Sequence, residues 1–284
     1  TLGLLIPPSI IMIVYGVTAN VSIAQLFIAG VFPGLLLASL FMAYTIVWSL
    51  LHPDQIPPAD QNMTFLQKLD ASRNLIPVIS LITAVLGSIY TGLATATEAA
   101  GLGVVGAMVI ATIQGEMSWK NFRDSLLGAT RLYCMIALIL AGAAFLTLAM
   151  GYIGLPRHLA EWIGSLGLSP LALVMALMAF FIILGCFLDG ISIIVLTMGI
   201  LLPTIEKAGI DLIWFGIYVV LVVEMAQITP PVGFNLFVLQ GMTKKEITWL
   251  AKHSMPMFFL MVGAVLLIYF FPGIITWLPQ HMAG

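Results

Sequence analysis

Long apolar runs alternate with short polar stretches along the whole chain. A membrane-spanning helix needs about 20 apolar residues, and the runs are of about that length or longer. The runs expected to enter or cross a membrane are 1–17, 23–50, 74–92, 97–114, 131–152, 170–205, 212–240 and 256–278. The polar stretches between them are 51–73, 115–130, 153–169 and 241–255. The pattern predicts an all-α, multi-pass membrane protein in the lipid bilayer.

Composition supports this prediction and excludes other classes. Hydrophobic residues make up 61% of the chain and charged residues 8%, whereas a soluble domain has about 25% charged residues. The net charge of −2 excludes a nucleic-acid binder, which needs a basic face. Two polar stretches, Thr64–Arg73 and Trp119–Arg131, have the pattern of amphipathic helices that lie at a membrane surface.

Two apolar runs are interrupted by paired prolines. The first pair is Pro7-Pro8 and the second is Pro230-Pro231, and in each case another proline follows 25 residues later, at Pro33 and Pro256. The loop after the first pair has no Lys or Arg, whereas the loop after the second contains Lys244, Lys245 and Lys252. By the positive-inside rule the second loop is cytoplasmic and the first external. Related segments of opposite orientation predict an inverted repeat, which is common in secondary transporters.

This orientation also constrains run 170–205, because the segments on either side of it require both of its ends to be external. We therefore expect a re-entrant hairpin with its turn near residues 188–192. The predicted organisation is the end of a first repeat (1–50), a cytoplasmic amphipathic connector (51–73) and a second repeat (74–284). In the second repeat we expect scaffold helices over 74–152, the hairpin over about 170–205, a broken helix over 212–240 and a last helix over 256–278.

Proline has no N–H, so each pair removes helical hydrogen bonds. The carbonyls expected to lose partners are those of Gly3, Leu4, Ala226 and Gln227. In a bilayer such groups must be buried in protein or line a wet cavity, where carbonyl oxygens suit an alkali cation. The nearby side chains that add oxygens are those of Ser9, Thr229 and Asn235. The alternative is that each pair only kinks its helix.

Three carboxylates lie at membrane depth or at the start of an apolar helix. Asp189, followed by Gly190 and Ser192, could cap the returning half-helix and also bind a ligand, because intramembrane carboxylates tend to be functional. Its alternative role is a cap alone. Glu224, one turn before the second proline pair, could act on a cation, exchange a proton or pair with a neighbouring helix. Glu98 begins an apolar helix, so a purely structural role is open for it as well.

Four sequence pieces resemble the DctM-type large membrane subunit of tripartite ATP-independent periplasmic (TRAP) transporters. They are TLGLLIPPSIIMIVYGV, YTGLATATEAAG, CFLDGISIIVLTMGILLP and VEMAQITPPVGFNLFV. The resemblance covers nearly the whole chain and implies an elevator-type, sodium-coupled importer of organic acids in the bacterial inner membrane. It implies a small DctQ-type membrane subunit and a DctP-type periplasmic binding protein as partners. The family's first hairpin, which precedes the IPPS segment, is expected to be missing from this sequence.

The resemblance also implies which residues bind Na⁺. It assigns Gly3, Pro7, Pro8 and Ser9 to one sodium site, and Asp189, Ser192, Thr229, Pro230, Gly233 and Asn235 to another. It leaves Glu98, Gly190 and Glu224 as candidates for substrate binding or coupling. The substrate carboxylate is expected between the two sites, and C4-dicarboxylates, sialic acids and sugar acids are all compatible with the sequence.

Two alternatives come from other classes. A permease subunit of an ATP-driven importer is suggested by Glu98-Ala99-Ala100 and the glycines after it, but the expected topology places Glu98 outside. An intramembrane hydrolase would need a second intramembrane Asp or a Ser–His pair, and neither occurs at convincing spacing. No catalytic residue is therefore predicted.

Overall fold

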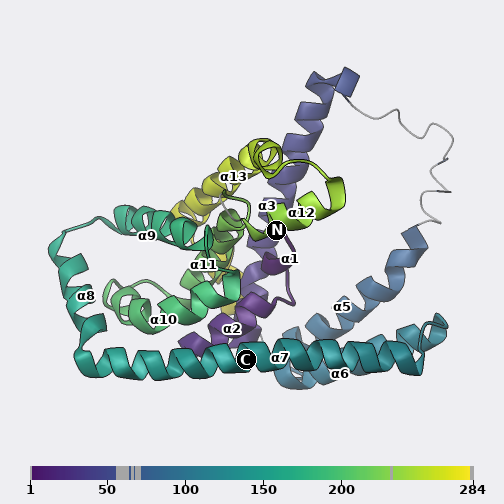
Figure 1. Cartoon of the computed structure of the whole chain (residues 1–284), viewed down its shortest axis with the longest axis horizontal. Helices are drawn as coiled ribbons and strands as arrows, with labels where there is room; N and C mark the ends of the chain where they lie inside the picture. Colours follow the sequence, from purple (N-terminus) through teal and green to yellow (C-terminus); the bar gives the residue numbers. More distant parts are fainter. Residues whose placement is uncertain (1, 56–63, 65–66, 68–71, 231–232, 282–284) are drawn as a thin grey trace. The chain divides into compact units, whose positions relative to one another are not determined.

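A computed structural model describes residues 2–55, 64, 67, 72–230 and 233–281, and no strand occurs among them. Figure 1 shows the helices, several of which are separated by only a few residues. Their bounds are α1 (Leu2–Leu5), α2 (Ile10–Ala19), α3 (Ile23–Leu51), η1 (Pro53–Gln55), η2 (Ser72–Leu75), α5 (Ile76–Tyr90), α6 (Ala96–Ile113), α7 (Trp119–Ile153), α8 (Leu155–Ser165), α9 (Pro170–Gly185), α10 (Gly190–Lys207), α11 (Leu212–Ala226), α12 (Phe234–Thr243), α13 (Ile247–Phe270) and α14 (Gly273–Gln280).

The expectation of an all-α membrane protein is confirmed. Among the described residues, α3, α6, α7, α10 and α13 are long and apolar enough to cross a membrane, and α5, α9 and α11 are shorter apolar helices. Large hydrophobic side chains on α5, α6 and α7 are exposed, including Val105 at 60% and Leu138 at 76%. Such surfaces are stable only against lipid or another apolar protein.

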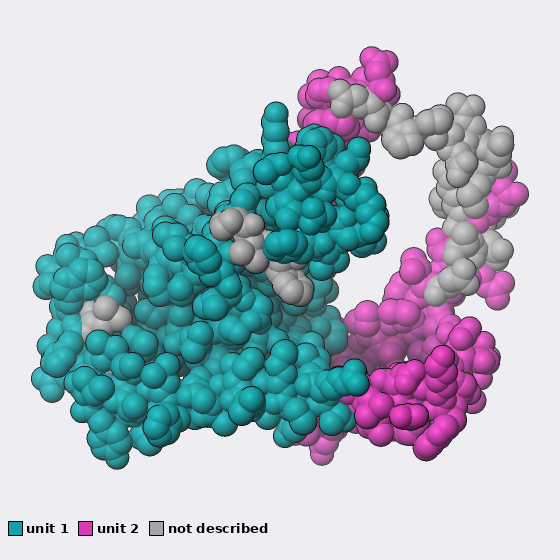
Figure 2. All heavy atoms as spheres, viewed as in Figure 1, with its two compact units in different colours: residues 1–37, 129–281 teal, residues 38–128, 282–284 magenta. Residues whose placement is uncertain are grey.

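The chain forms two compact units, which are coloured separately in Figure 2. The larger unit combines Thr1–Leu37 with Ala129–His281, and the smaller contains Ala38–Gly128. In the smaller unit, α5 packs against α6. The larger unit groups α1 and α2 with α8 to α14, so the two predicted repeats do not form two separate units.

Helix α11 is the core of the larger unit. Every residue from Trp214 to Ala226 is buried, and α11 contacts α1, α2, α9, α10, α13 and α14. Buried aromatic side chains tie neighbouring helices to it: the hydroxyl of Tyr15 donates to the Leu212 carbonyl at 2.7 Å, and the indole N–H of Trp214 donates to the Ile268 carbonyl at 3.0 Å. Buried Tyr and Trp require such partners, and these two bonds attach α2 and α13 to α11.

The order of elements repeats around the two proline pairs. Each interruption is followed by a ten-residue helix, α2 or α12, and these helices are capped by left-handed residues, Asn20 (φ 53°) and Lys244 (φ 58°). A long helix follows in each case, with Pro33 inside α3 and Pro256 inside α13. The prolines that follow each pair by 25 residues therefore lie in equivalent helices of the two segments. The opposite orientation of these segments in the membrane stays a prediction.

Three boundaries differ from the prediction. The expected surface helix Trp119–Arg131 and run 131–152 form the single helix α7, because no proline separates them. The stretch 153–169 contains α8, which a search for apolar runs overlooks because Arg157, His158 and Glu161 interrupt its apolar residues. The last helix begins at Ile247, where it packs on Leu236, and ends at Phe270 before the short α14. The expected helix Thr64–Arg73 lies largely outside the described residues.

Candidate functional site

The first break, Ile6–Ser9, joins α1 to α2. The side chain of Ser9, within the break, forms the hydrogen bonds that connect its two sides. Ser9 is the N-cap of α2: its hydroxyl oxygen accepts from the Met12 N–H at 3.4 Å, and its O–H donates to the Leu4 carbonyl. Ser9 is only 1% exposed. The helical donor to the Leu4 carbonyl would be residue 8, which is a proline, so the predicted loss of a helical partner is confirmed, and the Ser9 hydroxyl takes its place.

The second break, Gln227–Gly233, joins α11 to α12 and is closed mainly by backbone. The Ala226 carbonyl accepts from the N–H of Thr229, and the Gln227 carbonyl accepts from the N–H of Asn235, both at 3.1 Å. Neither bond is the helical one from the residue four positions later, which is a proline in both cases, so the predicted loss of helical partners is confirmed. A carbonyl has two lone pairs, so each keeps one for a ligand.

Helices α9 and α10 form a hairpin with its turn at Cys186–Asp189 (Figure 1), close to the turn expected at residues 188–192, while its re-entry into the membrane stays a prediction. We call this turn the hairpin tip. Asp189 caps α10, as predicted: one carboxylate oxygen accepts from the N–H groups of Ile191 (3.1 Å) and Ser192 (3.3 Å), and the other accepts from the Ser192 hydroxyl. The cap fixes the carboxylate at the start of a helix while leaving the residue exposed.

The hairpin tip packs against elements on both sides of the breaks. The thiol of Cys186 donates to the Pro230 carbonyl at 3.1 Å. At Gly190 a Cβ would approach Ile11 of α2 and Val223 of α11 to 2.7 Å, so only glycine allows this close approach. Sequence reasoning missed Cys186, because nothing in its local pattern shows a contact with a residue 44 positions away.

These elements enclose a cavity of 750 Å³, which we call the break cavity. It is lined by Gly3, Leu4, Ile10, Ile11, Leu132, Met135, Asp189, Gly190, Ile191, Gln227 and Asn235. The lining therefore joins residues beside both breaks with the hairpin tip, all within the larger unit. Its polar groups are a carboxylate, two amides and backbone oxygens, which are hard donors suited to an alkali or alkaline-earth cation.

Asn235 places an unpaired polar atom at the wall of the break cavity. Its side-chain Nδ2 is buried and has no hydrogen-bond partner among the described residues. Buried polar atoms are nearly always paired, so an unpaired one at a cavity wall marks a place for a ligand. Since the O and N of an amide are assigned from their hydrogen bonds, this position can present an oxygen to a cation or an N–H to an anion.

Other predicted site residues lie behind the cavity lining or elsewhere. The hydroxyl of Thr229 donates to the Met225 carbonyl at 2.7 Å within its own helical turn. Glu224 is completely buried in α11, where its carboxylate interacts with the backbone of Leu4 beside the first break. Glu98 lies in the smaller unit, where it forms a capping box with Thr95 at the start of α6.

Comparison with known proteins gives one family and several relatives. The family model described as "Tripartite ATP-independent periplasmic transporter, DctM component" matches residues 1–274. The chain is 32% identical over 283 residues to the C4-dicarboxylate TRAP transporter large permease protein DctM of Pseudomonas aeruginosa, covering 99% of this chain and 66% of that protein. It is 32% identical over 287 residues to the isethionate TRAP transporter permease protein DctMQ of Oleidesulfovibrio alaskensis, covering 100% and 44%.

A third relative is the sialic acid TRAP transporter permease protein SiaT of Haemophilus influenzae, with 30% identity over 282 residues, covering 98% of this chain and 45% of the relative. This chain thus spans less than two thirds of the length of each of these three proteins.

Proposed function

We propose, from the premise that this chain belongs to the DctM component family of tripartite ATP-independent periplasmic transporters, that it forms part of a sodium-coupled importer of an organic anion. The names of the relatives include C4-dicarboxylate, isethionate and sialic acid, and we propose a substrate of this anionic class. The family is described as ATP-independent, which speaks against the alternative of an ATP-driven permease. The proposed location is the bacterial inner membrane.

The observation that carries the proposal is the break cavity, where Asp189 and residues beside both breaks face one space. Unwound backbone and helix C-terminal ends are a recurring way of binding Na⁺ in transporters. We propose that Na⁺ is bound by oxygens of Gly3, Asp189 and Asn235. Around this shared site, the second break and the hairpin tip would be held in shape by Ser192, Thr229, Pro230 and Gly233, and the first break by Pro7, Pro8 and Ser9.

The break cavity also supports binding of an anion. No basic side chain is among the described residues that line it, so the attraction must come from another source. Ile10 and Ile11 are the first residues of α2, and Gly190 and Ile191 are the first residues of α10. Helix N-termini carry a positive partial charge that attracts a carboxylate, although at α10 the N–H groups of Ile191 and Ser192 are already bonded to Asp189. A bound Na⁺ next to these two N-termini would complete the charge balance.

We propose an elevator motion in which the larger unit, which holds the break cavity, moves as a transport body against scaffold helices. The exposed apolar side chains of α5 and α6 would then face lipid or the small DctQ-type subunit. The printed name DctMQ of one relative fits such a partner. A DctP-type periplasmic binding protein would deliver the substrate.

The test is uptake by the complete protein with its small subunit and binding protein, reconstituted in liposomes and driven by a sodium gradient without ATP. We expect Asp189→Ala and Asn235→Ala to lower sodium-dependent uptake more than they lower expression. Asp211→Ala is the matched control: Asp211 caps α11 through the Trp214 N–H at 2.8 Å and is not among the residues lining the break cavity. Unchanged sodium dependence in both site variants would refute the proposed site.

A further inference from the structure

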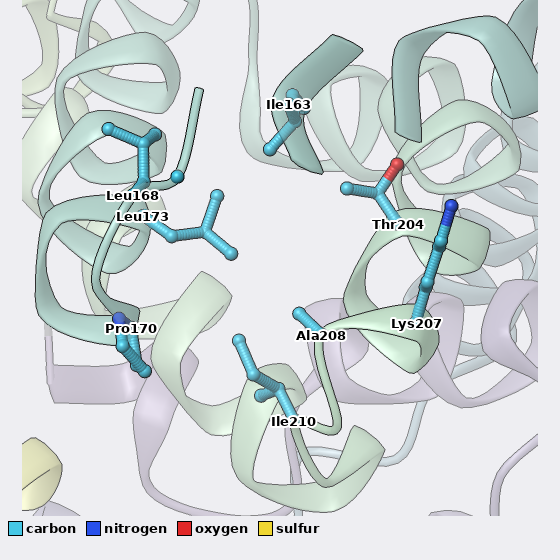
Figure 3. A pocket seen from close by; sticks show the side chains of 9 residues that line it. Ile163, Leu168, Pro170, Leu173, Thr204, Lys207, Ala208 and Ile210 are labelled. Carbon is cyan, nitrogen blue, oxygen red and sulfur yellow. The ribbon is translucent and has the colours of Figure 1, made fainter. Parts of the chain in front are cut away.

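A second cavity lies at the base of the hairpin, away from its tip. Its volume is 270 Å³, and we call it the base cavity. It is lined by α8, the link between α8 and α9, the start of α9, and the end of α10 with the turn after it (Figure 3). Its lining residues are Ile163, Gly167, Leu168, Pro170, Leu173, Thr204, Lys207, Ala208 and Ile210, none of which lines the break cavity.

Thr204 is the unusual residue of the base cavity. It is 4% exposed, and its hydroxyl oxygen has no hydrogen-bond partner among the described residues. A helical threonine normally bonds back to the carbonyl four residues earlier, as Thr197 of the same helix does with Ile193 at 2.7 Å. Buried hydroxyls without a partner are costly in an apolar setting, so the Thr204 hydroxyl indicates a ligand on this side of the cavity.

Lys207 supplies a positive charge beside that hydroxyl. Figure 3 shows Thr204 and Lys207 on the same side of the base cavity, with the hydroxyl oxygen and the amino nitrogen pointing the same way. One carboxylate that attracts Lys207 is that of Glu161 on α8, which is held by Arg157 at 2.9 Å. The bond to Arg157 lowers the pKa of Glu161, and the charges of Arg157 and Lys207 lower it further.

The charge of Lys207 determines the sign of the electrostatic potential in the base cavity, because the partial charges of the two helix ends beside it offset each other. The negative C-terminal end of α10 disfavours an anion there, but the positive N-terminal end of α9, at Pro170, offsets it. The full positive charge of Lys207 is larger than the partial charge at the end of either helix, which is about half an elementary charge. The base cavity is therefore suited to an anion that also has apolar surface, because the rest of its lining is mostly aliphatic.

We infer that the base cavity binds the phosphate headgroup of an anionic membrane lipid, with Thr204 and Lys207 donating hydrogen bonds to the phosphate oxygens. Two observations favour a lipid over a soluble anion. Ile163, Leu168 and Leu173 offer an apolar wall to the start of an acyl chain, and Trp162 on adjacent α8 is 59% exposed, as is common at a membrane interface. The lipid would pin α8 to the hairpin base, independently of sodium coupling.

The experiment follows the thermal midpoint of the complete protein in detergent micelles as phosphatidylglycerol or phosphatidylcholine is added. We expect phosphatidylglycerol to raise the midpoint and phosphatidylcholine to have little effect. Lys207→Gln and Thr204→Val should each weaken the apparent affinity for phosphatidylglycerol by about tenfold, the loss typical of one hydrogen bond to a charged group. The controls are Lys252→Gln, another exposed lysine, and Thr197→Val, which should both respond like the wild type.

Two further measurements test the roles of Glu161 and of the Thr204 hydroxyl. Glu161→Gln should tighten phosphatidylglycerol binding, because it removes the carboxylate that attracts Lys207. Thr204→Val without lipid should be at least as stable as the wild type, since it removes an unpaired hydroxyl; this keeps the test valid if Lys207→Gln folds poorly. The inference is overturned if both cavity variants respond to phosphatidylglycerol like the wild type, or if phosphatidylcholine or inorganic phosphate produces the same shift.

Discussion

The first break is closed from within its own segment, whereas the second depends on a distant part of the chain. At the first, Ser9 caps α2 and reaches back to Leu4. At the second, backbone N–H groups satisfy the carbonyls, and the thiol of Cys186 reaches Pro230 from the hairpin tip. A local cap forms whenever its helix forms, but a contact from the hairpin exists only while the hairpin is docked.

This difference suggests a division of labour between two otherwise similar elements. The first break is a rigid wall of the break cavity, because Ser9 is buried and bonds both to Leu4 and to Met12. The second is the side that can respond to a ligand, because its unpaired Asn235 amide and the Asp189 carboxylate both face the cavity. We therefore expect variants at the second break and the hairpin to change sodium coupling, and variants at the first to change stability.

The largest effect is expected from Gly185→Ala, which adds a methyl group where the hairpin packs against α11. A Cβ at Gly185 would collide with the Cβ of Ala226, beside the second break. Neither atom can move without shifting a helix, so overpacking should cost about 1–3 kcal/mol or more and abolish sodium-driven uptake. Unfolding and uptake of the purified variant measure both effects.

The control for this change is Gly263→Ala in α13, where an added Cβ meets no atom within 4 Å. Alanine is the better helix former by up to about 1 kcal/mol, so this variant should be neutral or slightly more stable. If Gly185→Ala behaved like Gly263→Ala in both assays, the close hairpin contact would not exist.

A pair of intermediate changes compares the breaks directly. Ser9→Ala removes a buried N-cap and should lower the free energy of unfolding by about 0.5–2 kcal/mol, while leaving the sodium concentration for half-maximal uptake unchanged. Thr229→Val removes a hydroxyl that bonds only within its own turn, so stability should change by less than about 1 kcal/mol. We expect it to raise that sodium concentration several-fold. If Ser9→Ala changed the sodium dependence and Thr229→Val changed only stability, the roles assigned to the two breaks would be wrong.

The smallest effect is expected from Glu98→Gln in the smaller unit. The substitution weakens the capping box with Thr95, which should cost less than about 1 kcal/mol and leave sodium dependence as in the wild type. Glu116→Gln, in the turn between α6 and α7, serves as the matched loss of charge without a cap. Loss of uptake in Glu98→Gln at normal expression would instead give Glu98 a coupling role.

The sequence was sufficient to predict the helical class and the two breaks from local features, and the hairpin from the orientation of its neighbours. Long apolar runs set helix length, and each pair of adjacent prolines interrupts a helix, whereas single prolines lie inside α3 and α13. The cap at Asp189 was also predictable from local features, since Asp before Gly and Ser is typical of a helix start. The continuous α7 was missed because a polar first turn does not stop a helix that contains no proline.

What the sequence could not supply were contacts across long separations. The loss of helical partners at the carbonyls of Leu4 and Gln227 was predictable, but the groups that replace them, the Ser9 hydroxyl and the Asn235 N–H, were not. The contact of Cys186 with Pro230 and the close approach at Gly190 depend on how the hairpin docks, which no local pattern encodes. Thr204 reads as an ordinary helical threonine until its surroundings are known.

The most direct test of the central claim, that residues beside both breaks and the hairpin tip share one cation site, is the thermal midpoint of the complete protein titrated with Na⁺ or K⁺. A ligand at one hundred times its Kd stabilises the folded state by about 2.7 kcal/mol. We predict that Na⁺, but not K⁺, raises the midpoint of the wild type and of Asp211→Ala, and that the midpoint of Asp189→Ala does not respond. A rise in Asp189→Ala as steep as in the wild type would contradict the account.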